Sequence, residues 1–496
     1  MKVFLMYPYQ DFDKEMHLPG NTTTLVEDLH LNILFNAMAK GDKFLWNVST
    51  VTLLSGLNDV ETILYRQAIL KDCLANSEIV RELYQIPIKS AERKQRRWLG
   101  IFSNSASGAL SNAVSMMEMF IVLLKDLKTL SVQHANRFKS AGFKRFFAFI
   151  QQELSTTFFE EAELHLEQLK FPDGVLLSAT LGKGNESDNL ILRKANETKN
   201  WLKALFSKQS SSYSFSISSR DDAGTRALSD IKNAATYAVA KSLSLAASHI
   251  DAFFKMLKDE LAFYVACLNL KDSLDRIGCK TCFPVPTNAS ERHHSFTDLY
   301  DVNLALTIKK AIVGNKLNAD EKSLAIITGA NQGGKTTFLR SIGLAQLMMQ
   351  AGMFVPADVF SANISQGVYT HFRREEDKSL RSGKLDEELK RMSEIIDQLD
   401  PNALILFNES FAATNEQEGS EIAQQITHAL IESQMKVFFV THMTEFAQSF
   451  FEKDLENIVF LRADRDAKGK RNYKITPGMP LDTSFGEDIF KSIFSK

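Results

Sequence analysis

Residues 324–350 have the sequence LAIITGANQGGKTTFLRSIGLAQLMMQ, and this stretch indicates the architecture of the C-terminal part of the chain. The apolar run at 324–328 predicts a buried strand, and the apolar spacing over 336–352 predicts a helix. Between them, 329–336 fits the pattern G-x-x-x-x-G-K-[ST] in every fixed position. Its glycines allow successive backbone N–H groups to face phosphate oxygens. The order of strand, loop and helix therefore predicts a nucleotide-binding P-loop.

Two side chains of this loop carry chemistry. Lys335 would place a positive charge beside the β- and γ-phosphates, and the hydroxyl of Thr336 would bind Mg²⁺. The helix that begins here adds the positive end of its dipole. A glycine turn with an exposed lysine is the structural alternative, and the strand and helix around the loop disfavour it. We therefore expect a nucleotide and Mg²⁺ at this position.

Two further apolar runs end in polar residues and supply the other expected members of the site. The run at 404–407 continues into Asn408 and Glu409, and Glu409 is the candidate base that activates the attacking water. Asn408 stands where an aspartate would normally hold the water shell of Mg²⁺, so it brings an oxygen but no charge. The run at 437–440 continues into Thr441 and His442, and His442 could hydrogen-bond the γ-phosphate. With a helix predicted at 418–433, the alternation indicates a parallel α/β domain.

The rest of the chain is predicted to be mainly helical. Helical spacing extends from about 23 to 169 and returns from about 225 to 270. Turn residues and alternating apolar residues between these stretches predict a small β insertion at about 171–220. The prolines and polar residues of 279–296 are typical of a linker. The predicted domains are an N-terminal segment (1–22), a helical domain (23–270), and an α/β domain (271–496), with strands of the insertion expected at 175–181, 190–193 and 213–217.

Composition limits the classes of partner. The formal net charge is −2, so any DNA binding must come from local basic patches. Four cysteines in 496 residues fit a reducing compartment, and we expect a cytoplasmic protein. The most apolar run is shorter than the roughly 20 residues that a membrane span needs, so no membrane association is expected. Candidate DNA contacts are the clusters Lys89, Arg93, Lys94, Arg96, Arg97 and Lys183, Arg193, Lys194, of which the first is more simply a solvated helix face.

Several blocks of sequence resemble the ATP-binding signatures of the MutS family. TGANQGGKTTFLRSIGLAQLMMQAGMFVPA at 328–357 is similar to the family's TGPNMGGKST followed by GxxVPA. NESFAATNEQEG at 408–419 keeps the spacing of DEIGRGTSTYDG, and VTHMTEF at 440–446 resembles ATHYHEL. SFG at 484–486 resembles the family's SYG, and 63–74 resembles its lever segment IxxRQxxVxxL. The blocks occur in the family's order, which makes an accidental likeness very improbable.

The resemblance implies a fold, a function and a site. The fold would be an α/β P-loop NTPase domain of the ABC-like MutS type, preceded by a mainly α-helical lever or core domain with a small β insertion. The protein would be a Mg²⁺-dependent ATPase and a homodimer that couples ATP binding and hydrolysis to clamping on DNA, in mismatch repair or recombination. It would be a form without the family's mismatch-recognition and connector domains. Catalytic roles fall on Glu409, Lys335 and His442, metal binding on Thr336 and Asn408, and nucleotide binding on Gly329, Ala330, Asn331, Gln332, Gly333, Gly334, Lys335, Thr336 and Thr337.

Departures from the family pattern leave other functions open. The family's loop DDLASGRSTF is only partly kept in DKSLRSGKLDEEL at 377–389, where Leu385 and Asp386 replace Ser-Thr. Together with Asn408, this favours an alternative in which the protein holds ATP with little hydrolysis and acts as a nucleotide-gated scaffold for DNA or a protein. An ABC-class ATPase that acts on RNA or the ribosome is a further alternative.

Overall fold

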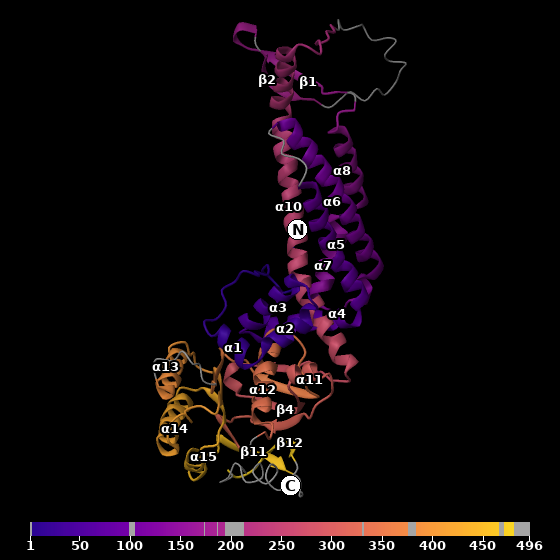
Figure 1. The fold of residues 1–496 in the computed structure, drawn as a ribbon. Coiled ribbons are helices and arrows are strands. Elements are labelled where there is room, and N and C mark those ends of the chain that lie inside the picture. The colour runs from indigo at the N-terminus through magenta and orange to yellow at the C-terminus, as the bar shows by residue number, and fades with distance from the viewer. Residues whose placement is uncertain are drawn as a thin grey trace, which may run out of the picture. The chain divides into compact units, whose positions relative to one another are not determined.

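The chain forms two compact units, each assembled from separate stretches of sequence. The α/β unit consists of Phe4–Val80, Lys139–Gly142 and Asp259–Lys496, and the helical unit of Met1–Val3, Arg81–Phe138 and Phe143–Lys258. These units do not follow the predicted limits at 22/23 and 270/271, because the helices near the N-terminus pack on the sheets of the α/β unit. The computed structural model, drawn in Figure 1, describes residues 2–98, 105–172, 174–185, 187–193, 213–329, 332–374, 383–465 and 471–480.

A six-stranded sheet forms the centre of the α/β unit. Its neighbouring strands are parallel except the pair β11–β12, which is antiparallel. β6 and β10 are buried along their whole length, as expected for central strands that are covered on both faces. In sheet order the strands are β12 (Arg471–Pro477), β11 (Ile458–Arg465), β6 (Leu324–Thr328), β10 (Lys436–Val440), β9 (Leu404–Asn408) and β8 (Val368–Phe372).

Helices cover both faces of this sheet (Figure 1). On one face, Phe407 of β9 and Phe439 of β10 stack at 4.8 Å in a core that also includes α13 (Lys384–Ile396), α14 (Glu416–Glu432) and α15 (Thr444–Phe451). Leu406 faces the opposite way, because successive strand residues alternate, and it contacts α12 (Lys335–Gln350) at Gly343. The predicted strands at 324–328, 404–407 and 437–440 and the helices at 336–352 and 418–433 are confirmed.

A second, four-stranded sheet overturns one prediction. It consists of β3 (Val285–Thr287), β7 (Val359–Asn363), β4 (His294–Leu299) and β5 (Asn315–Asn318) in that order. The predicted linker at 279–296 is therefore wrong, since it contains β3 and the start of β4. Phe296 stacks on Phe360 with ring centroids 6.1 Å apart, so this stretch is part of a packed sheet. Prolines and polar residues concealed the alternating burial of β4.

The N-terminal segment is fixed inside the α/β unit. The buried carboxylate of Glu260 accepts hydrogen bonds from the backbone N–H groups of Leu5 (2.5 Å), Met6 (3.1 Å) and Phe12 (3.4 Å). Burial raises the pKa of Glu260 to about 7, and the hydroxyl of Tyr264 donates to the carbonyl of Leu5. The helices that follow are α1 (Thr22–Asp28), α2 (Leu31–Ala39), α3 (Lys43–Ser55) and α4 (Val60–Ala75).

The helical unit contains long helices and the predicted β insertion. Phe120 of α6 packs against Phe254 of α10 at 5.8 Å, and Lys94 of α5 pairs with Asp251 of α10 at 2.7 Å. The hairpin β1 (Leu177–Leu181) and β2 (Ser187–Leu192) lies in the predicted insertion. The predicted strand at 213–217 is wrong, because this stretch is not a strand and pairs with no strand among the residues that the structure describes. The helices are α5 (Ser77–Trp98), α6 (Ala106–His134), α7 (Ala141–Glu153), α8 (Thr156–Gln168) and α10 (Asp222–Arg276), with α5, α7 and α10 also reaching into the α/β unit.

One helical stretch of the described chain, Ala106–Arg137, is long and apolar enough to cross a membrane by length and composition. Its most apolar window has a mean hydropathy of 1.5 and is 44% buried inside the protein. Phe120, Leu123 and Leu124 are buried in it, as expected for a core helix of a helical bundle. Length and composition alone do not distinguish these two roles, so the expected absence of membrane association stays a prediction.

Candidate functional site

The loop between β6 and α12 requires glycine at two described positions. Gly329 has φ 106° and Gly334 has φ 94°, backbone conformations that side-chain-bearing residues rarely adopt. A Cβ on Gly329 would also lie 3.0 Å from the backbone nitrogen of Ala463 in β11. The chain therefore turns sharply here and α12 begins directly at Lys335. Ala330 and Asn331, two of the predicted nucleotide-binding residues, lie outside the described residues.

The three residues with predicted catalytic roles lie together. Lys335 begins α12, Glu409 follows β9 and His442 follows β10, so all three stand beside the carboxyl ends of neighbouring parallel strands. Nε2 of His442 is 3.0 Å from Oε1 of Glu409 and 3.3 Å from Nζ of Lys335. Nζ of Lys335 also donates to the carbonyl of Gly329 at 2.7 Å. These contacts form a continuous polar chain from the loop to Glu409.

The contacts and the burial of this polar chain change the pKa values of Glu409 and Lys335. The hydrogen bond from His442 lowers the pKa of Glu409. Burial acts in the opposite direction and raises this pKa, and the positive charge of Lys335 lowers it further. Burial lowers the pKa of Lys335 to about 8, and the charge of Glu409 counteracts part of that effect. Glu409 is therefore a carboxylate at neutral pH and Lys335 is mostly an ammonium, a charge pattern suited to a base beside a phosphate-binding cation.

Thr336 and Asn408 are adjacent, as expected for a shared metal ligand set. The hydroxyl of Thr336 donates to Oδ1 of Asn408 at 2.9 Å. A hydroxyl oxygen and an amide oxygen are ligands that Mg²⁺ accepts, but they bring no negative charge. Mg²⁺ fits this oxygen pair, and Glu409, next to Asn408 in the chain, is the nearest carboxylate in sequence. No group of three or more His, Cys, Asp or Glu side chains that could hold a metal ion is found in the described part of the chain.

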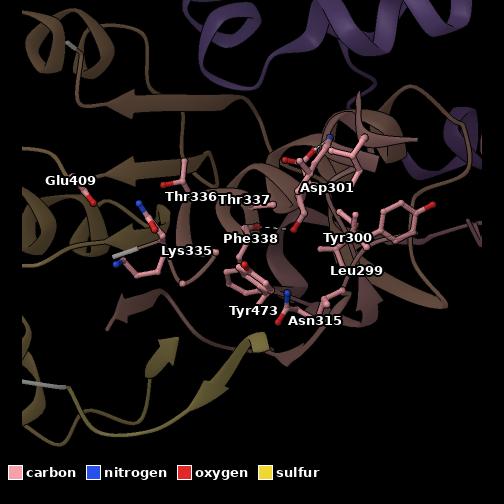
Figure 2. Close-up of a pocket in the computed structure, with 18 residues that line it drawn as sticks. Leu299, Tyr300, Asp301, Asn315, Lys335, Thr336, Thr337, Phe338, Glu409 and Tyr473 are labelled. Carbon is pink, nitrogen blue, oxygen red and sulfur yellow. Dashed lines mark hydrogen bonds between the residues drawn. The ribbon is translucent and has the colours of Figure 1, made fainter. Parts of the chain in front are cut away.

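A cavity of about 570 Å³ opens directly beside the loop (Figure 2). Residues from Gln332 to Thr337, in the loop and the first turn of α12, line its polar side together with Glu409. Tyr473 of β12 lies against the loop, since its Cβ is 3.7 Å from the position of a Cβ on Gly334. Phe338 and Ser341 of α12 also line the cavity. The remaining lining residues come from the stretch before β6 and are mostly apolar: Leu299, Tyr300, Asp301, Leu304, Ile308, Ile312, Val313 and Asn315.

The apolar side of this cavity and Tyr473 are not among the residues predicted from the sequence. Asp301 caps α11 (Val302–Ile308) by accepting from the N–H groups of Asn303 and Leu304, and this cap fixes the direction of the apolar helix. The apolar helical stretch upstream of β6 is the sequence signal that could have indicated this side of the cavity. Tyr473 gave no local signal, because the hairpin of β11 and β12 brings it to the loop from far along the chain.

Other predicted elements lie apart from this site or outside the described residues. The structure does not describe Ser484, Phe485, Gly486 or the first part of the 377–389 loop. In the second part of that loop, Leu385 and Asp386 lie in the first turn of α13. Nζ of Lys94 pairs with the carboxylate of Asp251 in α10 at 2.7 Å, so this member of the first basic cluster already has a partner within the protein. Lys89, Arg93, Lys183 and Arg193 belong to the helical unit, and nothing is described of the side chains of Arg96, Arg97 and Lys194.

Comparisons with known proteins match two parts of the chain. The MutS2 N-terminal domain family matches residues 58–277, and the family described as MutS domain V, an ATPase domain, matches residues 325–494. The second range includes Lys335, Glu409 and His442. These matches together span more than half of the sequence.

Individual relatives are similar over a shorter stretch. The chain is 27% identical over 188 residues to MutS protein homolog 4 of Homo sapiens, covering 36% of this chain and 20% of that protein. It is 31% identical over 175 residues to DNA mismatch repair protein MutS of Thermotoga maritima (35% and 22%), and 30% identical over 181 residues to Endonuclease MutS2 of Streptococcus uberis (36% and 23%). The match thus spans about a fifth of the length of these curated relatives.

Proposed function

The chain belongs to the MutS family, and from this premise we propose that its α/β unit is an ABC-like P-loop ATPase domain that binds and hydrolyses ATP with Mg²⁺. The observation that carries the proposal is the polar chain of Lys335, His442 and Glu409 beside a 570 Å³ cavity. A cavity with one polar and one apolar side matches a ligand that has a charged triphosphate and an apolar base.

Each residue around the cavity then has a part in the reaction. Backbone N–H groups of the loop and Nζ of Lys335 would hold the phosphates, and Thr336 and Asn408 would hold Mg²⁺. The metal would neutralise charge on the phosphate oxygens when bound. Glu409 would accept the proton of the attacking water, and His442 would orient Glu409 and contact the γ-phosphate.

Tyr473 provides a test of how the adenine ring of ATP binds. Because Tyr473 lies against Gly334 and lines the cavity, we propose that the adenine base stacks on its ring. Base–aromatic stacking contributes about 1–3 kcal/mol, so Tyr473→Ala should raise the Kd for ATP about 5- to 150-fold. Tyr473→Phe keeps the ring and should bind like the wild type. Calorimetric titration measures both, and equal Kd values for wild type and Tyr473→Ala would contradict stacking.

We further propose that the nucleotide state controls DNA binding by a cytoplasmic homodimer that clamps on DNA. The support is the family membership and the names of relatives, which include a DNA mismatch repair protein and an endonuclease. Since the net charge of the chain is −2, contacts to phosphates must come from local basic residues. Lys183 and Arg193 are exposed on and beside the β1–β2 hairpin and are the candidates.

Fluorescence anisotropy at one fixed salt concentration tests this coupling. Labelled homoduplex, mismatched and branched DNA are titrated with protein without nucleotide, with ADP and with ATP. We expect the affinity for at least one DNA to change severalfold between ADP and ATP. Absence of DNA binding in all three states would contradict the proposal, and binding of RNA in its place would favour an ATPase that acts on RNA or the ribosome.

Asn408 supports a second candidate function. An amide at the metal site lacks the charge that an aspartate would bring, which weakens Mg²⁺ binding and hydrolysis. The protein would then hold ATP with little turnover and act as a nucleotide-gated scaffold for DNA or a protein. This candidate shares the ATP site with the first and differs from it only in the rate of hydrolysis.

A further inference from the structure

The loop that carries Glu409 has an unusual backbone. Glu409 has φ 55° and Phe411 has φ 63°, both in the left-handed region that favours glycine. The signature DEIGRGTSTYDG, which 408–419 resembles, has a glycine where this chain has Phe411. A non-glycine residue keeps this conformation only when its surroundings hold it there.

Glu388 of α13 holds the backbone at Phe411. Its carboxylate Oε2 accepts the N–H of Phe411 at 2.5 Å, and the Glu388 residue is only 5% exposed. The Phe411 side chain is fully buried and stacks on the ring of His371, with centroids 5.2 Å apart and planes at 18°. A buried N–H without an acceptor is unfavourable, so loss of this carboxylate would release the loop.

A second set of hydrogen bonds joins the same elements. The Ser410 hydroxyl donates to the carbonyl of His371 at 2.6 Å and is 2.8 Å from Nδ1 of that ring. Nε2 of His371 is 3.0 Å from the carbonyl of Glu388, so this nitrogen carries the proton and donates. Both His371 and Ser410 are completely buried. β8, α13 and the loop are therefore connected through one network of buried polar groups.

α14 confines the loop from another direction. A Cβ on Gly419 would lie 2.4 Å from the carbonyl oxygen of Phe411, a distance that no side chain could occupy. The helix therefore approaches the loop backbone directly. With Glu388 on one element and Gly419 on another, the backbone of residues 409–411 has little freedom to move.

We propose that Glu388 is a positioning residue, which acts through Phe411 to fix the backbone of 409–411 and so holds the Glu409 carboxylate opposite Lys335. The inference rests on the proposed ATPase function, because it concerns the geometry of the same reaction. Catalysis is sensitive to such geometry, and a displacement of about 1 Å can reduce a rate about 100-fold. Substrate binding depends on the glycine-rich loop and the apolar side of the cavity, which Glu388 does not line.

Two substitutions of Glu388 distinguish the effect of its side-chain oxygen acceptor from the effect of its side-chain volume. Glu388→Gln keeps an oxygen that can accept from Phe411, whereas Glu388→Met has a similar size and no such acceptor. We expect Glu388→Met to lower kcat for Mg²⁺-ATP about 10- to 100-fold with KM changed less than about threefold. Glu388→Gln should stay within about threefold of the wild-type kcat.

A matched control removes an equivalent buried carboxylate far from the loop. Asp72 is 6% exposed and accepts the backbone N–H groups of Lys139 (2.9 Å) and Ser140 (2.7 Å) in the same unit. Asp72→Leu should lower the Tm and leave kcat unchanged. If Asp72→Leu reduces kcat as much as Glu388→Met does, or if Glu388→Met keeps the wild-type kcat, the positioning role is wrong.

Hydrogen exchange of the peptide 404–415 gives a readout that does not depend on turnover. We expect faster exchange in Glu388→Met than in wild type, Glu388→Gln or Asp72→Leu, and unchanged exchange would overturn the proposal. A wild type without ATP hydrolysis would contradict the proposed ATPase, while this exchange comparison would still decide the role of Glu388. If Glu388→Met does not fold, Ser410→Ala takes its place, with a severalfold loss of kcat expected and an unchanged kcat contradicting the proposal.

Discussion

Lys335→Ala is expected to abolish most of the affinity for ATP. Lys335 is buried, and its ammonium lies between the carbonyl of Gly329 and the ring of His442, where it would meet the phosphates. Removing one partner of a buried, hydrogen-bonded charge pair costs about 2–5 kcal/mol, which corresponds to a Kd about 30- to 4,000-fold higher. Calorimetric titration with Mg²⁺-ATP measures this change.

A matched lysine controls for the loss of charge itself. Lys322 precedes β6 in the same unit, and its ammonium donates to the carbonyl of Glu456 outside the cavity. Lys322→Ala should leave the Kd for ATP at the wild-type value. An equal loss of affinity in both variants, or no loss in Lys335→Ala, would contradict a phosphate-binding role for Lys335.

The same lysine predicts how ATP binding depends on pH. Burial lowers the pKa of Lys335 to about 8, so the fraction that carries a positive charge falls as the pH rises through this value. The Kd for ATP should be nearly constant below pH 7 and should rise by up to about tenfold per pH unit above pH 8. A Kd that is equal at pH 7 and pH 9 would show that this charge does not contribute.

Glu409→Gln is expected to stop hydrolysis while ATP still binds. The amide oxygen of glutamine can accept the hydrogen bond that the Glu409 carboxylate accepts from His442 at 3.0 Å, so the geometry is kept. The amide cannot take a proton from water, and loss of a general base lowers kcat about 10²- to 10⁴-fold. Phosphate release and ATP titration on the same preparation measure the two quantities separately.

Two outcomes of this comparison would change the account. If Glu409→Gln hydrolyses ATP at the wild-type rate, Glu409 is not the base. If both proteins bind ATP and neither releases phosphate, the nucleotide-gated scaffold is favoured, since Asn408 then leaves the metal site too weak for turnover.

The centre of the site could be predicted from sequence because its signals are local. Short apolar runs ending in Asn408 and Glu409 or in His442 mark buried parallel strands, and glycines mark the loop before α12. Parallel strands of one sheet bring their carboxyl ends together. The contact between Glu409 and His442 therefore follows from strand order, and the structure has it.

The remaining parts depend on contacts between distant segments. Tyr473 reaches the loop only through the antiparallel pair β11–β12, and Glu388 reaches Phe411 only through the packing of α13. Neither residue has a distinctive neighbour in sequence. The predicted linker at 279–296 failed for a similar reason, because the pairing of β4 with β7 outweighs the prolines and polar residues around it. Local propensity is a weak prior where tertiary packing decides.

The most direct measurement is the initial rate of phosphate release from Mg²⁺-ATP by the wild-type protein, at one stated salt concentration, with and without homoduplex, mismatched and branched DNA. We expect turnover that depends on Mg²⁺ and that at least one of these DNAs changes severalfold. A rate at background under every condition, or turnover that no DNA affects, would contradict an ATPase that is coupled to DNA binding.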